Sequence, residues 1–201
     1  MHLKFQYNKT ALQSLNKQLN VRLRALPTLK NKESALRMEV KKAKAEVKKL
    51  AGEQEDLIRE QDKNLRMWNE FDPGLVNVSE VKLGYRKIAG EKIPELADVL
   101  FHIEDFDVFV SPKWFLDGIE VLKKLLKLVI ARDIAEKKMN MLEYARKKTT
   151  QKVNLFEKVQ IPAYEDAIQK IKRYLEDEEN LAKSAQKIVK KRQQKIEEAV
   201  L

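Results

Sequence analysis

The sequence has no cysteine and few residues that interrupt helices. Without a thiol among its 201 residues, disulfide bonds and cysteine metal ligands are excluded, which suits a reducing compartment. Glycine and proline occur five times each, and aromatic residues make up only 7% of the chain. A chain with so few helix breakers and so much Lys, Glu, Leu, Ala and Arg is typical of long helices and coiled coils.

Long apolar runs are also missing. The longest is the four-residue stretch from Leu128 to Ala131, far below the length that crosses a bilayer. The opening residues 1–8 contain no apolar core of signal-peptide length. We therefore expect a soluble protein with no direct membrane insertion, which reaches a membrane only through partners.

The motifs of catalysis are absent as well. The glycines are scattered and none precedes a Lys-Ser or Lys-Thr pair, so there is no phosphate-binding loop. The two histidines, His2 and His102, have no second histidine at ligand spacing. Acidic clusters such as 176–179 lie around a helix and do not converge on one point. We expect no catalytic residue, no cofactor and no metal, and hence no enzyme.

The charge balance is strongly basic. Charged residues make up 36% of the chain and the net charge is +10, which favours an anionic partner such as nucleic acid, a membrane surface or an acidic protein surface. The basic runs at 41–49 and 187–195 contain no aromatic residue for base stacking, and glutamates dilute them. Coiled-coil flanking charge explains them better than nucleic-acid binding does.

A coiled-coil seam runs through residues 8–68. In alternating steps of three and four from Leu12, twelve of seventeen positions to Trp68 are apolar, while the residues between are mostly charged or polar. A helix of roughly 60 residues would be about 90 Å long. Pro27 removes a backbone donor and should kink this helix. The first segment, 1–69, is therefore predicted to be one long helix.

The connecting segment, 70–112, changes period. Asp72-Pro73-Gly74 is a stop signal, after which apolar residues alternate from Val76 to Tyr85. Residues 88–93 predict a strand, a tight turn at Gly90 and a return strand, and Pro94 indicates that the return strand is an edge or is interrupted. Less clear extended stretches follow at 99–103 and at Phe106, Val108 and Val110. The hairpin should rest on the helices, because an isolated hairpin is only marginally stable.

The last segment, 113–201, is predicted to be a second long helix. Ser111 and Pro112 suit its N-cap and first position. Its apolar stripe changes phase across Pro162, which indicates a stutter or kink there. The expected fold is mainly α: a long antiparallel two-helix coiled coil with a short β-hairpin between the helices.

Three phrases of the sequence carry a family resemblance. Residues 153–162, Val-Asn-Leu-Phe-Glu-Lys-Val-Gln-Ile-Pro, resemble a phrase of the D subunit, the central rotor stalk of V/A-type rotary ATPases. The stretch 29–36 and the hairpin phrase 89–94 are similar to two further segments of that family. The motif residues are Val153, Asn154, Glu157, Ile161 and Pro162, and the hairpin residues are Ile88, Gly90, Ile93 and Pro94. Phe156 and Lys152 depart from the family pattern, as do Pro27 and Asn180.

The resemblance implies a non-catalytic rotor shaft. Such a shaft transmits torque between ATP hydrolysis or synthesis in a catalytic hexamer and proton or sodium transport in a membrane ring. The implied partners are the catalytic and non-catalytic subunits of the hexamer, the small F subunit of the central stalk, and a socket subunit above the ring. The hairpin is expected to stimulate hydrolysis. Cationic residues expected to face an acidic hexamer bore are Arg22, Arg24, Lys30, Lys32, Lys170, Lys172 and Arg173.

Two other functions fit the residues less well. A coiled-coil adaptor or scaffold would explain the seam, although it has no need of a strand insert between its helices. A basic nucleic-acid-binding arm would explain the charge, and its binding would fall steeply with salt. The location implied by the family is cytoplasmic and peripheral to the membrane through the ATPase complex.

Overall fold

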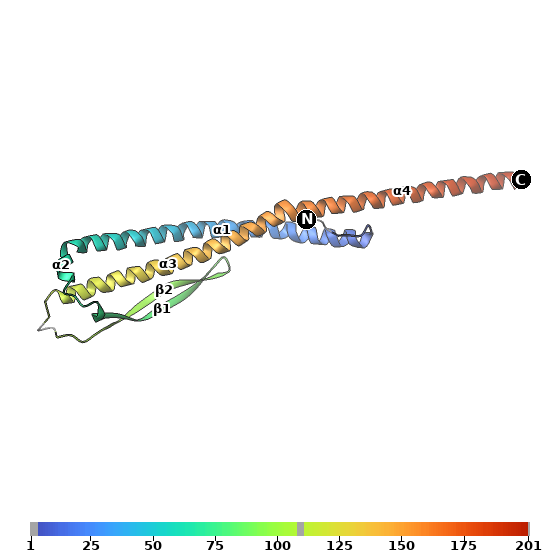
Figure 1. The fold of residues 1–201 in the computed structure, drawn as a ribbon. Coiled ribbons are helices and arrows are strands. Elements are labelled where there is room, and N and C mark those ends of the chain that lie inside the picture. Colours follow the sequence, from blue (N-terminus) through green and yellow to red (C-terminus); the bar gives the residue numbers. More distant parts are fainter. Residues whose placement is uncertain (1–3, 108–110, 201) are drawn as a thin grey trace. The chain divides into compact units, whose positions relative to one another are not determined.

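The computed structural model describes residues 4–107 and 111–200, without the side chains of Leu65 and residues 195–200 (Figure 1). Its helices and strands are α1 (Lys9–Gln61), α2 (Leu65–Trp68), β1 (Val76–Ile88), β2 (Glu91–Ile103), α3 (Phe115–Leu155) and α4 (Ile161–Val200). A π-helical turn, Phe156–Gln160, joins α3 to α4. The predicted fold class, a mainly helical chain with a hairpin between two long helices, is confirmed.

The chain forms two compact units, and each contains part of α1. Unit 1 consists of the chain up to Asn31 and from Thr150 onward, and unit 2 of Lys32–Thr149. Within each unit, α1 pairs with a later helix that runs in the opposite direction. In unit 1, for example, Gln18 contacts Tyr164 and Lys30 contacts Glu157.

The seam predicted on α1 is confirmed by burial. Every seam position from Leu12 to Gln61 is buried or half-buried, including the polar ones such as Arg22 and Gln54. The regular three-four spacing keeps one face of α1 against its partner helix along the whole element. α1 runs through Pro27 without a break. The hydrogen bond that Pro27 cannot donate would have gone to the carbonyl of Leu23, a residue that is 43% exposed.

The core of unit 1 lies between the start of α1 and the first half of α4. Leu15 packs there among four residues of α4, and Phe5, Leu12, Leu19 and Leu175 cover the cluster. The four buried residues of α4 are Tyr164, Ala167, Ile168 and Ile171. Before α1 begins, Tyr7 also contacts Tyr174, with ring centroids 5.0 Å apart. At the start of α1, Lys9 and Leu12 line a hollow together with α4 residues as far as Ala182.

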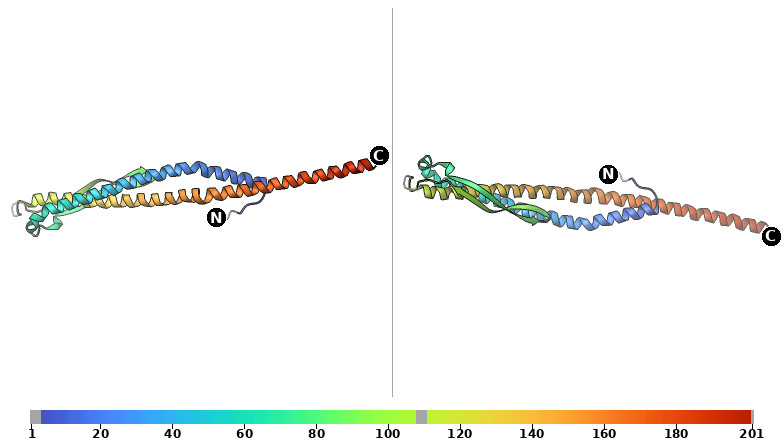
Figure 2. Two further views of the ribbon diagram at one scale, coloured as in Figure 1. Left: turned by 90° about the horizontal axis from the view of Figure 1, so that it is seen from above. Right: turned by 90° about the horizontal axis from the view of Figure 1, so that it is seen from below.

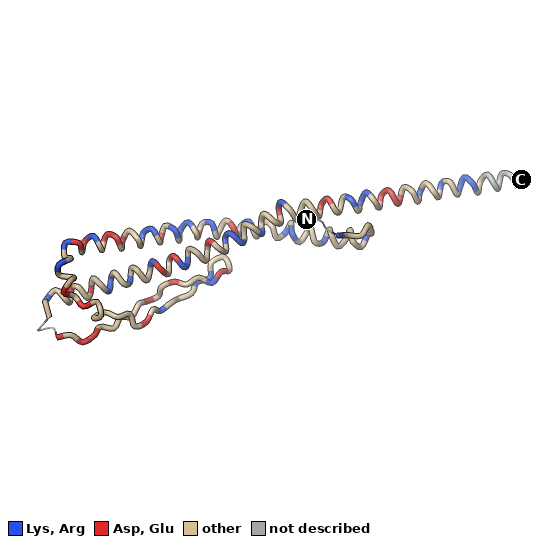
Figure 3. Tube along the Cα trace, viewed as in Figure 1, with Lys and Arg blue, Asp and Glu red and all other residues tan. Residues whose placement is uncertain are grey.

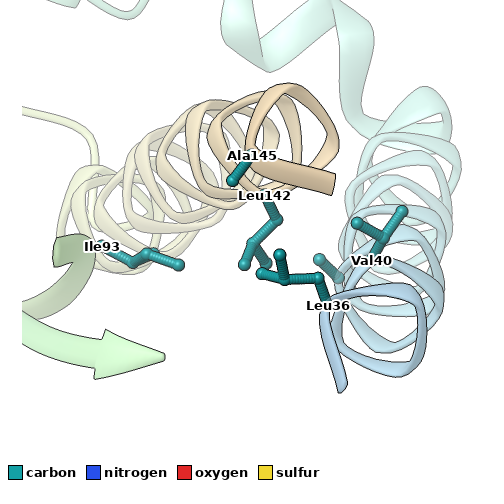
Figure 4. Close-up of a cluster of buried hydrophobic side chains, with 6 residues drawn as sticks. Leu36, Val40, Ile93, Leu142 and Ala145 are labelled. Atoms are coloured by element: carbon teal, nitrogen blue, oxygen red, sulfur yellow. The ribbon is translucent and has the colours of Figure 1, made fainter. Parts of the chain in front are cut away.

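The core of unit 2 joins all three layers of that unit. Leu36 from α1, Leu142 from α3 and Ile93 from β2 are each 0% exposed and meet in one cluster with Val40 and Ala145 (Figure 4). Ile93 is the hairpin's contribution to this core. The prediction that the hairpin rests on the helices is therefore confirmed.

The hairpin itself is regular and longer than the sequence indicated. β1 and β2 pair antiparallel from Val76↔Ile103 to Ile88↔Glu91, with register shifts near Ser79 and Lys82. Tyr85 lies opposite Pro94, and since the sheet has two strands, Pro94 occupies an edge as predicted. Phe106 lies beyond β2, and Val108 and Val110 lie outside the described residues. At the other end, Phe71, Leu75, Val76, Phe115 and Ile119 form a third core.

The predicted helix ends are wrong in two places. The first long helix ends at Gln61 instead of Trp68, because a 3₁₀ turn and α2 turn the chain so that Trp68 packs edge-on against Phe71 and Trp114. The last helix begins at Phe115, not at Ser111 and Pro112. The Phe115 N–H donates to the Pro112 carbonyl, and the first helical bond runs from Gly118 to Trp114. Aromatic packing accompanies the first of these ends and overrides local capping at the second.

The burial of Ile93 yields a test of how the hairpin is held. Ile93→Ala should lower the free energy of unfolding by about 2–4 kcal/mol, because it leaves a cavity between α1 and α3. Val81→Ala, at an exposed position of β1, should cost less than about 1 kcal/mol. Urea unfolding followed by circular dichroism measures both. Equal losses in the two variants would contradict the packing described.

Candidate functional site

The tip of the hairpin is a two-residue turn of unusual backbone. Ala89 has φ 49° and Gly90 has φ 87°, and positive φ at both central residues is what a type I′ turn requires. Such turns match the right-handed twist of the strands they connect. Ile88 and Ala89 pack against the unit 2 core, so one side of the tip is fixed.

Charged groups surround the fixed tip. Lys32 of α1 reaches Glu91 at 3.4 Å, and a Cβ on Gly90 would lie 3.7 Å from the Lys32 Nζ. On the strands, the Lys92 ammonium lies 4.3 Å from the centre of the Tyr85 ring. The four predicted hairpin residues therefore differ in their roles. Ile88 and Ile93 anchor the tip, Gly90 forms its turn, and Pro94 lies on the strand opposite Tyr85.

The family motif lies on the π-helical turn and its flanks. Val153 and Ile161 are buried, whereas Asn154, Glu157 and Pro162 are exposed. The Ile161 N–H donates to the Phe156 carbonyl, five residues back, which is the hydrogen bond of a π-helix. The phase change predicted at Pro162 is confirmed, and this turn is its physical form.

α1 contacts this turn through polar side chains. The Arg22 Nε donates to the Gln160 Oε1 at 2.7 Å, and the Arg22 guanidinium lies 4.4 Å from the centre of the Tyr164 ring. The Lys30 Nζ lies 2.6 Å from a Glu157 carboxylate oxygen. The Tyr164 hydroxyl donates to Gln18 at 2.7 Å. Sequence reasoning missed Gln18 and Gln160, because glutamine is common at any exposed helix position and carries no distinguishing pattern.

The seven predicted cationic residues fall into two groups. Arg22, Lys30 and Lys32 contact other parts of the chain, and Lys170 pairs with Asp166 one turn earlier on α4 at 2.8 Å. Within the described residues, the other three are exposed and have no hydrogen bond or ion pair to the chain. These three, named here the free cations, are Arg24, Lys172 and Arg173.

The end of α4 carries an apolar face that no described residue covers. Leu181 is 72% exposed, and Ile188 and Val189 are each more than half exposed. Lys183 and Lys187 lie between them, and Figure 3 shows only basic residues among the charged positions along this part of α4. Exposed apolar side chains do not stabilise an isolated helix. This face therefore has the character of a contact surface.

Unit 2 contains a groove between α1, β2 and α3, with a volume of about 600 Å³. Leu57, Leu96 and Leu128 contribute apolar lining. Acidic residues of α1 line one side, and Lys124 and Lys127 of α3 line the other. The acidic residues are Glu53, Asp56 and Glu60. An apolar floor between walls of opposite charge suits the side of an amphipathic helix.

Two exposed charged groups on α4 have shifted pKa values. The hydrogen bond from Lys170 to Asp166 raises the pKa of Lys170, and the hydrogen bond from Lys183 lowers the pKa of Glu179. Both shifts favour the charged forms of exposed helix pairs. Among residues 4–107 and 111–200, no group of three His, Asp or Glu side chains is placed to hold a metal ion.

The long helices are rich in charge. None of the described helices has the length and the apolar character needed to cross a bilayer. Figure 3 shows why for α1 and α3, since charged residues of both signs recur along each helix.

The geometry defines a class of protein: a pair of long antiparallel helices with a β-hairpin inserted between them and packed on their seam. The family described as the ATP synthase D subunit matches residues 11–191. The V-type ATP synthase D subunit of Borreliella burgdorferi is 31% identical over 189 residues, which are 93% of this chain and 94% of that protein. The protein of the same name from Chlamydia muridarum is 24% identical over 203 residues, 98% of this chain and 100% of the relative.

The match extends over both long helices and the hairpin. This chain belongs to the ATP synthase D subunit family. The resemblance seen in three short phrases of the sequence is thereby confirmed along nearly the whole chain. Membership makes it a component of a V-type ATP synthase complex.

Proposed function

We propose that this chain is the non-catalytic central-stalk subunit of a V/A-type rotary ATPase. It transmits torque between ATP hydrolysis or synthesis in the catalytic hexamer and proton or sodium transport in the membrane ring. The observation that carries the proposal is the family match over residues 11–191, on a chain whose two long helices pair along one seam. In such a complex it lies on the cytoplasmic side of the membrane and binds no nucleotide itself.

Transmission of torque requires that the paired helices do not slide along each other. Side-chain bonds between the helices oppose sliding in both units. In unit 2, Arg132 donates to Gln54 at 2.9 Å and Lys138 contacts Glu46 at 2.9 Å. In unit 1, Tyr164 donates to Gln18 at 2.7 Å. Such bonds are directional and form at only one alignment of the two helices. Apolar packing alone opposes sliding less specifically.

The free cations support contact with an acidic surface of the hexamer. Arg24, Lys172 and Arg173 lie in unit 1 together with the exposed apolar face at the end of α4. Cations without an intramolecular partner keep their full attraction for an outside anionic group. We assign the bore contact to these three residues, and a structural role within the chain to Arg22 and Lys30.

The groove of unit 2 suits the small F subunit of the central stalk. Its apolar floor at Leu57 and Leu128, with Lys124 and Lys127 on one wall, would accept a helix with acidic residues on one flank and basic residues on the other. The aromatic core around Trp68 and Phe115 stabilises the end of unit 2 that we assign to the socket subunit above the ring.

Copurification tests the assignment directly. The tagged chain, expressed in its native cells, should bring down a hexameric ATPase and a small partner, with one copy of the chain per complex. ATPase activity of the eluate and native mass spectrometry measure this result. Recovery of RNA would contradict the rotor assignment and favour a nucleic-acid-binding arm. Recovery of proteins without nucleotide-binding subunits would favour an adaptor.

Reversing the free cations should weaken coupling. In the triple variant Arg24→Glu, Lys172→Glu and Arg173→Glu, ion transport per ATP hydrolysed should fall several-fold, because acidic side chains would face the acidic bore. Transport and hydrolysis are measured together in reconstituted vesicles. The matched control reverses three exposed lysines of unit 2, at Lys41, Lys48 and Lys137, and should keep more of the coupling. Unchanged coupling in the first triple variant would remove the bore assignment.

Shortening the hairpin should lower the rate of hydrolysis. Deleting Ala89–Lys92 removes the turn and the partner of Lys32, while Ile93 and the seam remain. The ATPase rate of the reconstituted complex should fall and assembly should persist. Lys32→Gln, which breaks only the contact to Glu91, serves as the control for that ion pair. Loss of the assembled complex on deletion would make the hairpin a structural element instead.

A further inference from the structure

The two helices of unit 1 differ by one residue in their apolar spacing. On α1 the seam proceeds from Leu12 by threes and fours without exception. On the partner, the inward positions proceed by threes and fours through Phe156, and again from Ile161 to Leu175. Between Phe156 and Ile161 the step is five. Five residues of α-helix turn by about 500°, which would place Ile161 about 140° away from the seam.

The π-helical turn absorbs this additional residue. Because its hydrogen bond spans five residues, from the Ile161 N–H to the Phe156 carbonyl, both ends of the step face α1. Ile161 is buried and Phe156 is half-buried. The turn is therefore the means by which α3 and α4 share one partner helix, and its length is set by the sequence step.

Pro162 favours the same geometry. In a continuous α-helix it would lack the hydrogen bond to the Lys158 carbonyl, and its ring would clash with that carbonyl. Lys158 lies inside the π-helical turn, shortly before Pro162. The turn thus falls where an α-helix would have been strained in any case.

The turn is held mainly by polar contacts, together with the half-buried Phe156. None of its five residues is buried. The ion pair of Lys30 with Glu157 joins side chains that are 48% and 43% exposed, so it contributes little to stability. The better-protected contact is the hydrogen bond of Arg22 to Gln160, with Arg22 also stacked on Tyr164. By contrast, the α-helical turns of α4 that follow the π-helical turn contain the buried residues Ala167, Ile168 and Ile171.

We propose that the π-helical turn Phe156–Gln160 is a torsional release point, which opens before the helical turns on either side and whose opening Arg22 restrains. Local opening costs least where few apolar contacts are buried and hydrogen bonds are exposed. A helix that yields at one defined turn takes up twist there and leaves the packed seams intact. The inference concerns the chain itself and holds whether or not the chain turns inside a hexamer.

Hydrogen exchange of the full-length chain tests this inference. Amides of residues 157–161 should exchange at least about tenfold faster than those of 142–149 and 164–171. Arg22→Met keeps most of the apolar stem but removes the bond to Gln160, so it should speed exchange of 157–161 further. Exchange of 142–149, in unit 2, should not change. Equal protection of all three segments in the parent chain would overturn the proposal.

A deletion provides the complementary variant. Removing Lys158 together with Pro162→Ala reduces the step of five to four, so the inward positions from Leu142 to Leu175 are spaced by threes and fours only. This variant should melt no lower than the parent, and its exchange at the turn should fall to that of its neighbours. The control removes Lys147, an exposed residue where no additional residue is present, and should melt lower. Equal destabilisation by both deletions would also overturn the proposal.

Discussion

The fold depends on burial of the single seam of α1. Three other parts of the fold pack on it: α3 and α4 each cover one part of the seam, and the hairpin joins the seam core through Ile93 (Figure 2 shows the elements from two further sides). A seam with strict three-four spacing accepts only partners with matching faces. The one mismatch, between Phe156 and Ile161, is accommodated in the partner and leaves α1 regular.

Much of this arrangement could be predicted from the sequence, for a physical reason. Periodic burial leaves a periodic pattern, so the seam of α1, the stripe of α3 and the phase change at Pro162 were visible. Helix ends left no such pattern. Ser111 and Pro112 have good local capping propensity, but the packing of Trp114 and Phe115 on Phe71 moved the start of α3. Contacts between distant residues decided that outcome, and local propensity does not contain them.

The candidate site residues divide in the same way, into those that a pattern in the sequence predicted and those that only the structure distinguishes. The strand–turn–strand pattern predicted Ile93 and the hairpin turn at Gly90, and the family resemblance singled out Ile161; both isoleucines are buried. The sequence grouped seven cationic residues by their place along the chain and their charge. Only the geometry separates Arg22 and Lys30, which contact the π-helical turn, from Arg24, Lys172 and Arg173. A positive charge looks the same in a sequence whether or not it has a partner.

The antiparallel pairing has a consequence for how the chain folds. Contacts between the helices join residues ever farther apart in sequence: 78 for Gln54 and Arg132, 92 for Glu46 and Lys138, 138 for Arg22 and Gln160. Closing a large loop from the unfolded chain costs more entropy than extending a pair that has already formed. Pairing therefore propagates from the hairpin end as a zipper. During synthesis, the apolar seam at the start of α1 has no partner until α4 has left the ribosome.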